Sequence, residues 1–210
     1  MSGALSRQAI KRLPDYLQYL RKAAAEGREY ITATAIAEAT RLNEVQVRKD
    51  ISAISSHSGK PMVGFPVPEL IQDIETYLGN EAGQKAVLVG AGSLGRALMG
   101  YGGFAPYGLH IAASFDLRPA DALVGGIPVL PMSKLEETCR ELDARIGIIA
   151  IPPEAAQSVC DRLVACGVKA IWNFAPTFLK APGDVLIHNE LLASSAAVMV
   201  RQLQEMENKP

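Results

Sequence analysis

A glycine-rich turn from Gly90 to Gly95 is the segment whose residue types and spacing point most directly to chemistry. An apolar run of strand length, 85–89, precedes the turn, and a helical pattern begins at Arg96. In a strand–turn–helix of this kind the first glycine makes the tight turn, the second admits a pyrophosphate and the third allows close helix–strand packing. We therefore expect a dinucleotide on the backbone of this turn, at Gly90, Ala91, Gly92, Ser93, Leu94 and Gly95.

An acidic residue at the end of the next predicted strand indicates which dinucleotide is bound. Asp116 follows the apolar segment 110–115 and lies 21 residues after Gly95. A carboxylate there accepts hydrogen bonds from the adenosine ribose and repels a 2′-phosphate, so NADH and NAD⁺ are favoured over their phosphorylated forms. Arg118 weakens this preference, because a nearby arginine could bind that phosphate. The alternative is an α/β fold that binds no nucleotide.

The elements that must position this turn alternate along the rest of the chain. Strands are predicted at 127–130, 145–151, 169–174 and 184–188, with helices at 133–142 and 153–166. Such alternation predicts a parallel sheet, whose ligands lie outside the carboxyl ends of the strands. This places 151–153 and 173–176 on the nicotinamide side, with Pro152 and Asn173 as candidate contacts. Asn173 could instead hydrogen-bond its own loop.

The N-terminal part has the pattern of a helix-turn-helix. Helices are predicted at 10–25, where Pro14 marks either a kink or the first turn, and at 33–40 and 44–55, with Thr32 and Asn43 as caps. Polar residues on the third helix could contact bases or phosphates, although an ordinary exposed face is the alternative. A polar turn and the extended segment 62–65 then suggest a β-wing with its tip at Gly59-Lys60, followed by a helix to Leu78. The candidate DNA contacts are Gln46, Arg48, Lys49, Ser52 and Lys60.

The length of the chain suits one large domain or two small ones. The chain has 210 residues and 49% hydrophobic residues. Residues 1–62 carry ten Lys/Arg and six Asp/Glu (+4), which leaves eleven and sixteen (−5) for the remainder. A basic N-terminal part is a weak indication of nucleic-acid binding. We predict a cytoplasmic protein, because no signal or membrane segment is evident. The three cysteines and three histidines have no metal-site spacing, so no metal is expected.

The last predicted helix, about 190–207, has a broad apolar face centred on small residues. Such a face suggests burial at a subunit interface, and docking on its own sheet is equally compatible with the pattern. We therefore divide the chain at 80 and 188. The expected roles are DNA binding for 1–80, dinucleotide binding for 81–188 and dimerisation for 189–210.

Several blocks, taken in order, resemble the Rex family of redox-sensing transcriptional repressors. The resemblance covers nearly the whole chain and implies an α/β fold with a winged-helix domain, a Rossmann domain and a C-terminal helix exchanged in a homodimer. It also implies a repressor that binds palindromic operator DNA and releases it when NADH binds, with no catalytic residues. By matching position, Tyr101 becomes a candidate for the cleft wall near the nicotinamide. The blocks are Arg12-Leu13-Pro14-x-Tyr16-Leu17, 45–52, 63–65, 90–98, 101–104, 115–116, 154–157 and 173–176.

The sequence departs from the family pattern at three places. The wing is one residue longer, and Lys60 stands where arginine is usual, which removes a guanidinium fork. Leu191 and Leu192 occupy positions where an acid and an aromatic residue are common. Gln18 stands where an arginine could pair with that acid. We hypothesise that apolar packing replaces this ion pair and changes how the dimer switches.

Two other functions compete with this interpretation. An NAD-dependent dehydrogenase with an accessory domain would need a general acid or base, and no histidine is placed with a carboxylate near the predicted cleft. A CoA-binding-like ligand module is compatible with the second half of the chain but leaves residues 1–66 unexplained.

Overall fold

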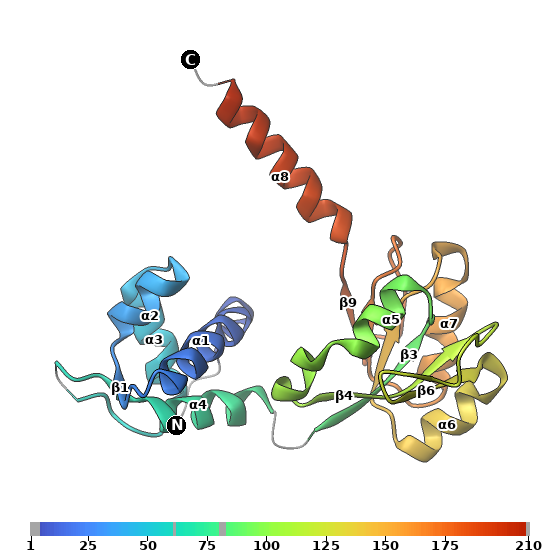
Figure 1. Cartoon of the computed structure of the whole chain (residues 1–210), viewed down its shortest axis with the longest axis horizontal. Coiled ribbons are helices and arrows are strands. Elements are labelled where there is room, and N and C mark those ends of the chain that lie inside the picture. Colours follow the sequence, from blue (N-terminus) through green and yellow to red (C-terminus); the bar gives the residue numbers. More distant parts are fainter. Residues whose placement is uncertain (1–4, 61, 80–82, 209–210) are drawn as a thin grey trace. The chain divides into compact units, whose positions relative to one another are not determined.

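The structure, a computed structural model, describes residues 5–60, 62–79 and 83–208 (Figure 1). The chain separates into two units, Met1–Ala82 and Gly83–Pro210. This border lies two residues after the division predicted at residue 80, and residues 80–82 lie outside the described part of the chain. Among the described residues, no helix is long and apolar enough to cross a membrane.

Side-chain caps begin the first three helices of the N-terminal unit. Ser6 caps α1 (Arg7–Ala25), Thr32 caps α2 (Ala33–Thr40) and Asn43 caps α3 (Glu44–Ile54), each by accepting a backbone N–H. The predicted caps Thr32 and Asn43 are thus confirmed. Because α1 begins at Arg7, Pro14 lies inside the helix and not in its first turn. The fourth helix, α4 (Val67–Leu78), ends at Gly79 in the left-handed conformation.

One apolar core holds these helices together. Leu13, Leu17 and Leu20 of α1 lie fully buried at helical spacing, and each such leucine contributes roughly 2 kcal/mol by burial. From α3, Val47 and Ile51 enter the same core. Their burial leaves the opposite face of α3 exposed to solvent.

The segment after α3 returns to the unit as a short hairpin. Strand β2 (Phe65–Pro66) pairs antiparallel with β1 (Tyr30–Ile31). Lys60 and Gly64 bridge each other with two backbone hydrogen bonds of 2.9 Å. The predicted tip at Gly59-Lys60 is therefore wrong, because the turn is closed between Lys60 and Gly64. The segment 62–65 is not extended throughout, since Met62 and Gly64 have positive φ. Pro61 lies outside the described residues.

The C-terminal unit is built on a seven-stranded sheet in the order β5-β6-β4-β3-β7-β8-β9. All neighbours are parallel except β5, an edge strand that the sequence did not predict and that pairs antiparallel with β6. The strands are β3 (Gln84–Val89), β4 (Leu109–Asp116), β5 (Leu123–Val124), β6 (Ile127–Pro131), β7 (Ile146–Ile149), β8 (Ala170–Asn173) and β9 (Leu186–Asn189).

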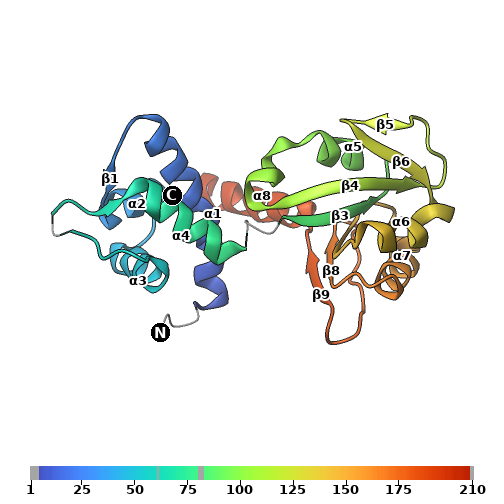
Figure 2. The ribbon, with the colours of Figure 1, turned by 90° about the horizontal axis from the view of Figure 1, so that it is seen from below.

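Helices cover both faces of this sheet, as Figure 2 shows. Val87 and Val89 of β3 pack toward α6 (Leu135–Leu142) and α7 (Pro153–Ala165), whereas Ala86 and Leu88 pack toward α5 (Ser93–Gly100). Two short 3₁₀ helices, Gly102–Tyr107 and Met132–Lys134, connect the layers. The strand order changes direction at β3, which lies between β4 and β7. Such a switch point is where open α/β sheets bind ligands.

The last helix, α8 (Leu192–Glu207), extends from the end of β9 (Figure 1). None of its residues, all of which are described, is buried. Of the two possibilities for its apolar face, the structure therefore does not show docking on the sheet of its own unit.

Candidate functional site

The exposed face of α3 carries the polar residues predicted to contact DNA. Gln46, Arg48, Lys49 and Ser52 are all exposed. Arg48 forms an ion pair with Glu44 one helical turn earlier. Because the Arg48 side chain is largely exposed and the Glu44 side chain partly so, solvent weakens the pair, and a phosphate or a guanine edge can replace Glu44.

A buried polar network, which sequence reasoning did not identify, fixes the opposite face of α3. Asp50 accepts hydrogen bonds from Arg12 Nε (2.8 Å) and Nη2 (3.0 Å) and from the Tyr16 hydroxyl (2.9 Å). Burial, followed by the hydrogen bond to Asp50, raises the pKa of Tyr16 to about 12. The network ties α3 to α1, so it sets the angle at which the exposed face is presented. Its signal was the position of Asp50, which places a charge among the core residues Val47 and Ile51.

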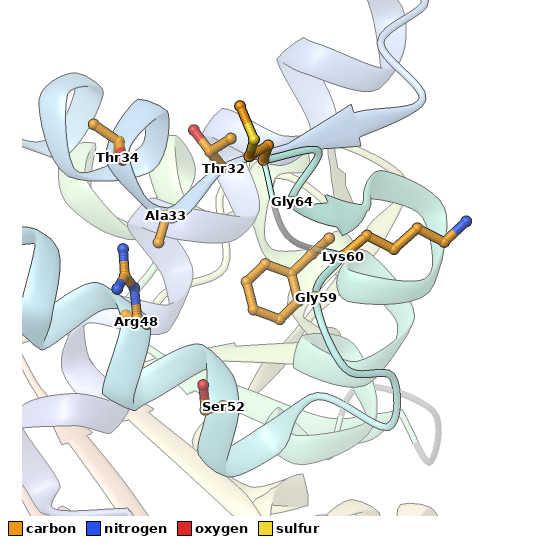
Figure 3. A pocket seen from close by; sticks show the side chains of 10 residues that line it. Thr32, Ala33, Thr34, Arg48, Ser52, Gly59, Lys60 and Gly64 are labelled. Atoms are coloured by element: carbon orange, nitrogen blue, oxygen red, sulfur yellow. The ribbon is translucent and has the colours of Figure 1, made fainter.

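A hollow of about 520 Å³ lies between α3, the start of α2 and the wing turn (Figure 3). Arg48 and Ser52 reach it from α3, and Thr32 and Thr34 reach it from α2. Thr32, Ala33 and Thr34, at the start of α2, line its wall, and the N-terminal end of a helix carries partial positive charge. The hollow therefore has hydroxyl, amide and guanidinium donors suited to an anionic backbone.

The predicted wing contact Lys60 lines the same hollow, but its ammonium group lies elsewhere. Lys60 Nζ is 3.4 Å from the Tyr30 hydroxyl and 5.3 Å from the centre of its ring. In Figure 3 the side chain points away from Arg48. The wing itself is held close to β1, because a β-carbon at Gly64 (φ +100°) would lie 2.1 Å from Ile31 O.

In the other unit, the glycine turn has the geometry that a pyrophosphate requires. Gly90 has φ +108°, and a β-carbon there would lie 2.3 Å from Ala150 O. A β-carbon at Gly95 would lie 1.8 Å from Gly90 O, so α5 packs closely against the turn. At Gly92, by contrast, a β-carbon would meet no described atom within 4 Å. Gly90 and Gly95 are thus required by the fold, whereas Gly92 leaves open space beside the backbone.

Asp116 is bound to this turn. Its carboxylate accepts the Ala91 N–H (2.8 Å) and the Arg118 N–H (2.9 Å). The residue at the end of β4 and the turn at the end of β3 therefore lie next to each other. Arg118 itself is exposed.

A cavity of about 420 Å³ opens at the switch point of the sheet. It brings together three predicted residues, Gly90, Asp116 and Pro152, from the ends of β3, β4 and β7. Pro152 shares the cavity with Asp116, the residue predicted to bind the adenosine ribose, and the nicotinamide side expected for 151–153 stays a prediction. Tyr101 and Asn173 do not line this cavity.

One face of α7 contributes polar residues to the cavity that the sequence reasoning missed. Glu154, Ser158 and Arg162 recur at intervals of four and line its wall. Arg162 donates to Glu136 (2.6 Å) and to Met132 O (2.8 Å). The hydrogen bond from Arg162 lowers the pKa of Glu136. The available signal was the i, i+4, i+8 spacing after a strand whose end faces the cleft.

Tyr101 belongs to an aromatic cluster next to α5. Its ring packs edge-on against the ring of Phe104, with 4.9 Å between the ring centres. Trp172 and Phe174 extend the cluster to the end of β8. Gly103 makes room for it, because a β-carbon there would lie 2.4 Å from the Tyr101 ring. Tyr101 remains 60% exposed, so the cluster presents a phenol to solvent.

Asn173 is fully buried and its side chain is occupied within the unit. The amide nitrogen donates to Ala175 O, Thr177 O and Asn189 Oδ1, and the amide oxygen accepts from Ala175 N–H. These contacts favour the loop-bonding alternative over a direct contact with a nicotinamide.

Cys139 and Cys160 are buried, and burial raises the pKa of both thiols. The described residues contain no group of three or more His, Cys, Asp or Glu that could hold a metal ion.

Gln18 and Leu192 are exposed and Leu191 is half-buried, so the hypothesis about dimer switching stays a prediction.

Two family models match the chain. Residues 4–52 match a model described as the N-terminus of a putative DNA-binding protein. Residues 81–177 match a CoA-binding domain.

Relatives match over nearly the whole length. A redox-sensing transcriptional repressor Rex from Treponema denticola is 42% identical over 91% of both chains. The solved structure of RSP in complex with β-NAD⁺ and operator DNA is 31% identical, with a TM-score of 0.88 over 98% of this chain and 95% of that one. The structure of RSP with β-NADH has a TM-score of 0.85 at the same identity, over 98% and 97%.

Proposed function

The chain belongs to the Rex family of redox-sensing transcriptional repressors, and we propose that it binds palindromic operator DNA through α3 and the wing and releases it on binding NADH. One observation carries this proposal: a donor-lined groove beside α3 and a dinucleotide-type crevice at Asp116 occur in separate units of one chain. Relatives across nearly the whole chain are named repressors, so the dehydrogenase alternative is set aside.

At the DNA end, α3 enters the major groove with Gln46, Arg48, Lys49 and Ser52 toward the base edges and phosphates. The hollow between α3, α2 and the wing turn then receives the sugar–phosphate strand that borders the groove. Thr34, Ser52 and the N–H groups of α2 are the donors for that strand. The solved relative in complex with operator DNA supports DNA binding by this chain.

Replacing Arg48 with alanine is expected to weaken DNA binding by roughly 10- to 100-fold, because one bidentate base contact carries about that much discrimination. The measurement is fluorescence anisotropy on a palindromic duplex selected by the wild-type chain from a random pool. Lys11→Ala, which removes an exposed charge from α1, is the matched control. Equal losses in the two variants would show that only net charge matters and would contradict the assignment.

At the dinucleotide end, the turn from Gly90 to Gly95 holds the pyrophosphate and Asp116 holds the adenosine ribose. The open space at Gly92 and the position of Asp116 beside the turn support this placement. Glu154, Ser158 and Arg162, which line the cavity with Asp116, border the adenosine. Tyr101, whose ring is exposed beside α5, is the candidate for the nicotinamide side. The nicotinamide carries the redox state, and the residues of this chain bind and orient the dinucleotide.

The variant Asp116→Ser is expected to shift preference toward phosphorylated dinucleotides. Removing the carboxylate relieves repulsion of a 2′-phosphate and leaves Arg118 nearby, so the ratio of NADPH to NADH affinity should rise about tenfold or more. Competition binding with both dinucleotides measures this ratio, and Asp121→Ser, at an exposed acid paired with Arg96, is the control. An unchanged ratio in Asp116→Ser would sink the ribose assignment.

A second copy of the chain completes the assembly in this proposal. The apolar residues of α8, among them Val198, Met199 and Leu203, are exposed in the single chain. Burial of this face against a partner fits a homodimer, and two copies match the two halves of a palindrome. Residues 1–80 then bind DNA, 81–188 bind the dinucleotide and 189–210 join the subunits, in a protein of the cytoplasm where DNA is accessible.

A further inference from the structure

The tip of the wing is apolar and fully exposed. Met62 has a completely solvent-accessible side chain, and Val63 beside it is also exposed. Met62 further has φ +62°, a conformation that costs free energy for any residue with a β-carbon. The methionine thus occupies a strained position in which its side chain is not buried by the described part of the unit.

The turn that carries Met62 is held in place. Lys60 and Gly64 exchange two backbone hydrogen bonds, and Val63 N–H donates to Lys60 O at 3.2 Å. Gly64 lies against the backbone of Ile31, and Ser56 N–H is bound by Asp73 of α4. These contacts present the Met62 side chain at a defined place and reduce the entropy lost when it binds.

The charge of the wing is directed away from this tip. Lys60 Nζ lies over Tyr30, outside the space between the turn and Arg48. The exposed tip of the wing therefore consists of the Met62 thioether and the Val63 side chain and carries no cation.

The hollow between α3 and the wing determines which part of the DNA this tip contacts. If α3 lies in the major groove, the adjacent groove on the duplex is the minor groove, and a single sugar–phosphate strand separates the two. The hollow, which Arg48, Ser52 and Thr34 line on one side and Met62 borders on the wing side, is the seat for that strand. The wing, on the far side of the hollow, faces the minor groove.

We propose that Met62 enters the minor groove as an apolar wedge and makes the chain sensitive to the shape and deformability of the base step beneath it. This inference rests on the proposed function of α3. Apolar side chains placed in a minor groove partly unstack a step, and flexible steps with an unobstructed groove accept them at the lowest cost. Sequence preference would thus extend beyond the pairs that α3 contacts.

The test uses anisotropy of the full chain on the selected duplex. Met62→Gly, which suits the positive φ and keeps the fold, should weaken binding about tenfold through the loss of apolar contact. Met62→Leu should recover most of that loss. The slope of log affinity against log salt should stay the same in all three proteins, since no phosphate contact changes.

A modified duplex tests the groove itself. Replacing adenine by 2,6-diaminopurine at the pairs protected by the wing adds an amino group in the minor groove and leaves the major-groove pattern intact. This change should weaken the wild-type chain severalfold and Met62→Gly much less. Equal penalties, or Met62→Gly binding as tightly as wild type, would overturn the inference. Arg48→Ala in the same assay still reports on α3, so failure of the wedge and failure of the proposed function are distinguishable.

Discussion

A chain with Gly92→Ala is expected to lose NADH affinity by about a hundredfold or more, which corresponds to about 2.7 kcal/mol, while folding and binding DNA like wild type. A β-carbon at Gly92 fits the free protein, because φ is −72° and no described atom lies within 4 Å of it. The same methyl group would occupy the space through which a pyrophosphate approaches the backbone.

Isothermal titration with NADH, together with thermal unfolding, measures both parts of this prediction. Gly100→Ala is the matched control, since it adds a methyl group in open space at the other end of α5. Gly95→Ala would not be informative about binding, because its β-carbon would collide with Gly90 O and disturb the turn itself. If Gly92→Ala bound NADH as tightly as wild type, the assignment of the pyrophosphate to this turn would be wrong.

The second large effect is expected at Asp50. Replacing Asp50 with alanine should lower the free energy of unfolding of the N-terminal unit by about 3 kcal/mol, because it leaves the Arg12 guanidinium and the Tyr16 hydroxyl without their acceptor. The Asp50 side chain is only 5% exposed, whereas Arg12 is 17% exposed and can regain some solvation, so we expect the lower end of the usual range. DNA binding should fall as well, since α3 loses its attachment to α1.

Urea unfolding followed by circular dichroism measures the stability change. Tyr16→Phe is the graded comparison: it removes one hydrogen bond and keeps the Arg12–Asp50 pair, so a loss of about 1 kcal/mol is expected. If Asp50→Ala changed the free energy of unfolding no more than Tyr16→Phe, the ion pair would contribute little and the orienting role of this network would be wrong.

Local signals carried most of the fold. The caps Thr32 and Asn43, the bounds of α2 and the strand before Gly90 were predicted from short patterns, and the structure agrees with them. Patterns of this kind depend on neighbouring residues, which the sequence displays directly. The edge strand β5 was not predicted, because a strand of two residues is too short to show a periodic pattern.

Long-range contacts were harder to predict. The closing hydrogen bonds between Lys60 and Gly64 depend on how the hairpin meets β1, so the wing tip was misplaced. The shared edge of the strand ends did not reveal that Pro152 lines one cavity with Asp116, because this depends on the order of the strands. Asn173 shows the same limit, since its partners Thr177 and Asn189 come from the following loop and from β9.

In this proposal, dinucleotide binding in one unit weakens DNA binding in the other. The most direct test titrates the protein–duplex complex with NADH and with NAD⁺ and follows anisotropy, with Gly92→Ala as the unresponsive control. We predict that saturating NADH lowers DNA affinity by about tenfold or more, that duplex lowers NADH affinity by the same factor, and that NAD⁺ has a much smaller effect. An unchanged DNA affinity at NADH concentrations that saturate the protein would contradict the account.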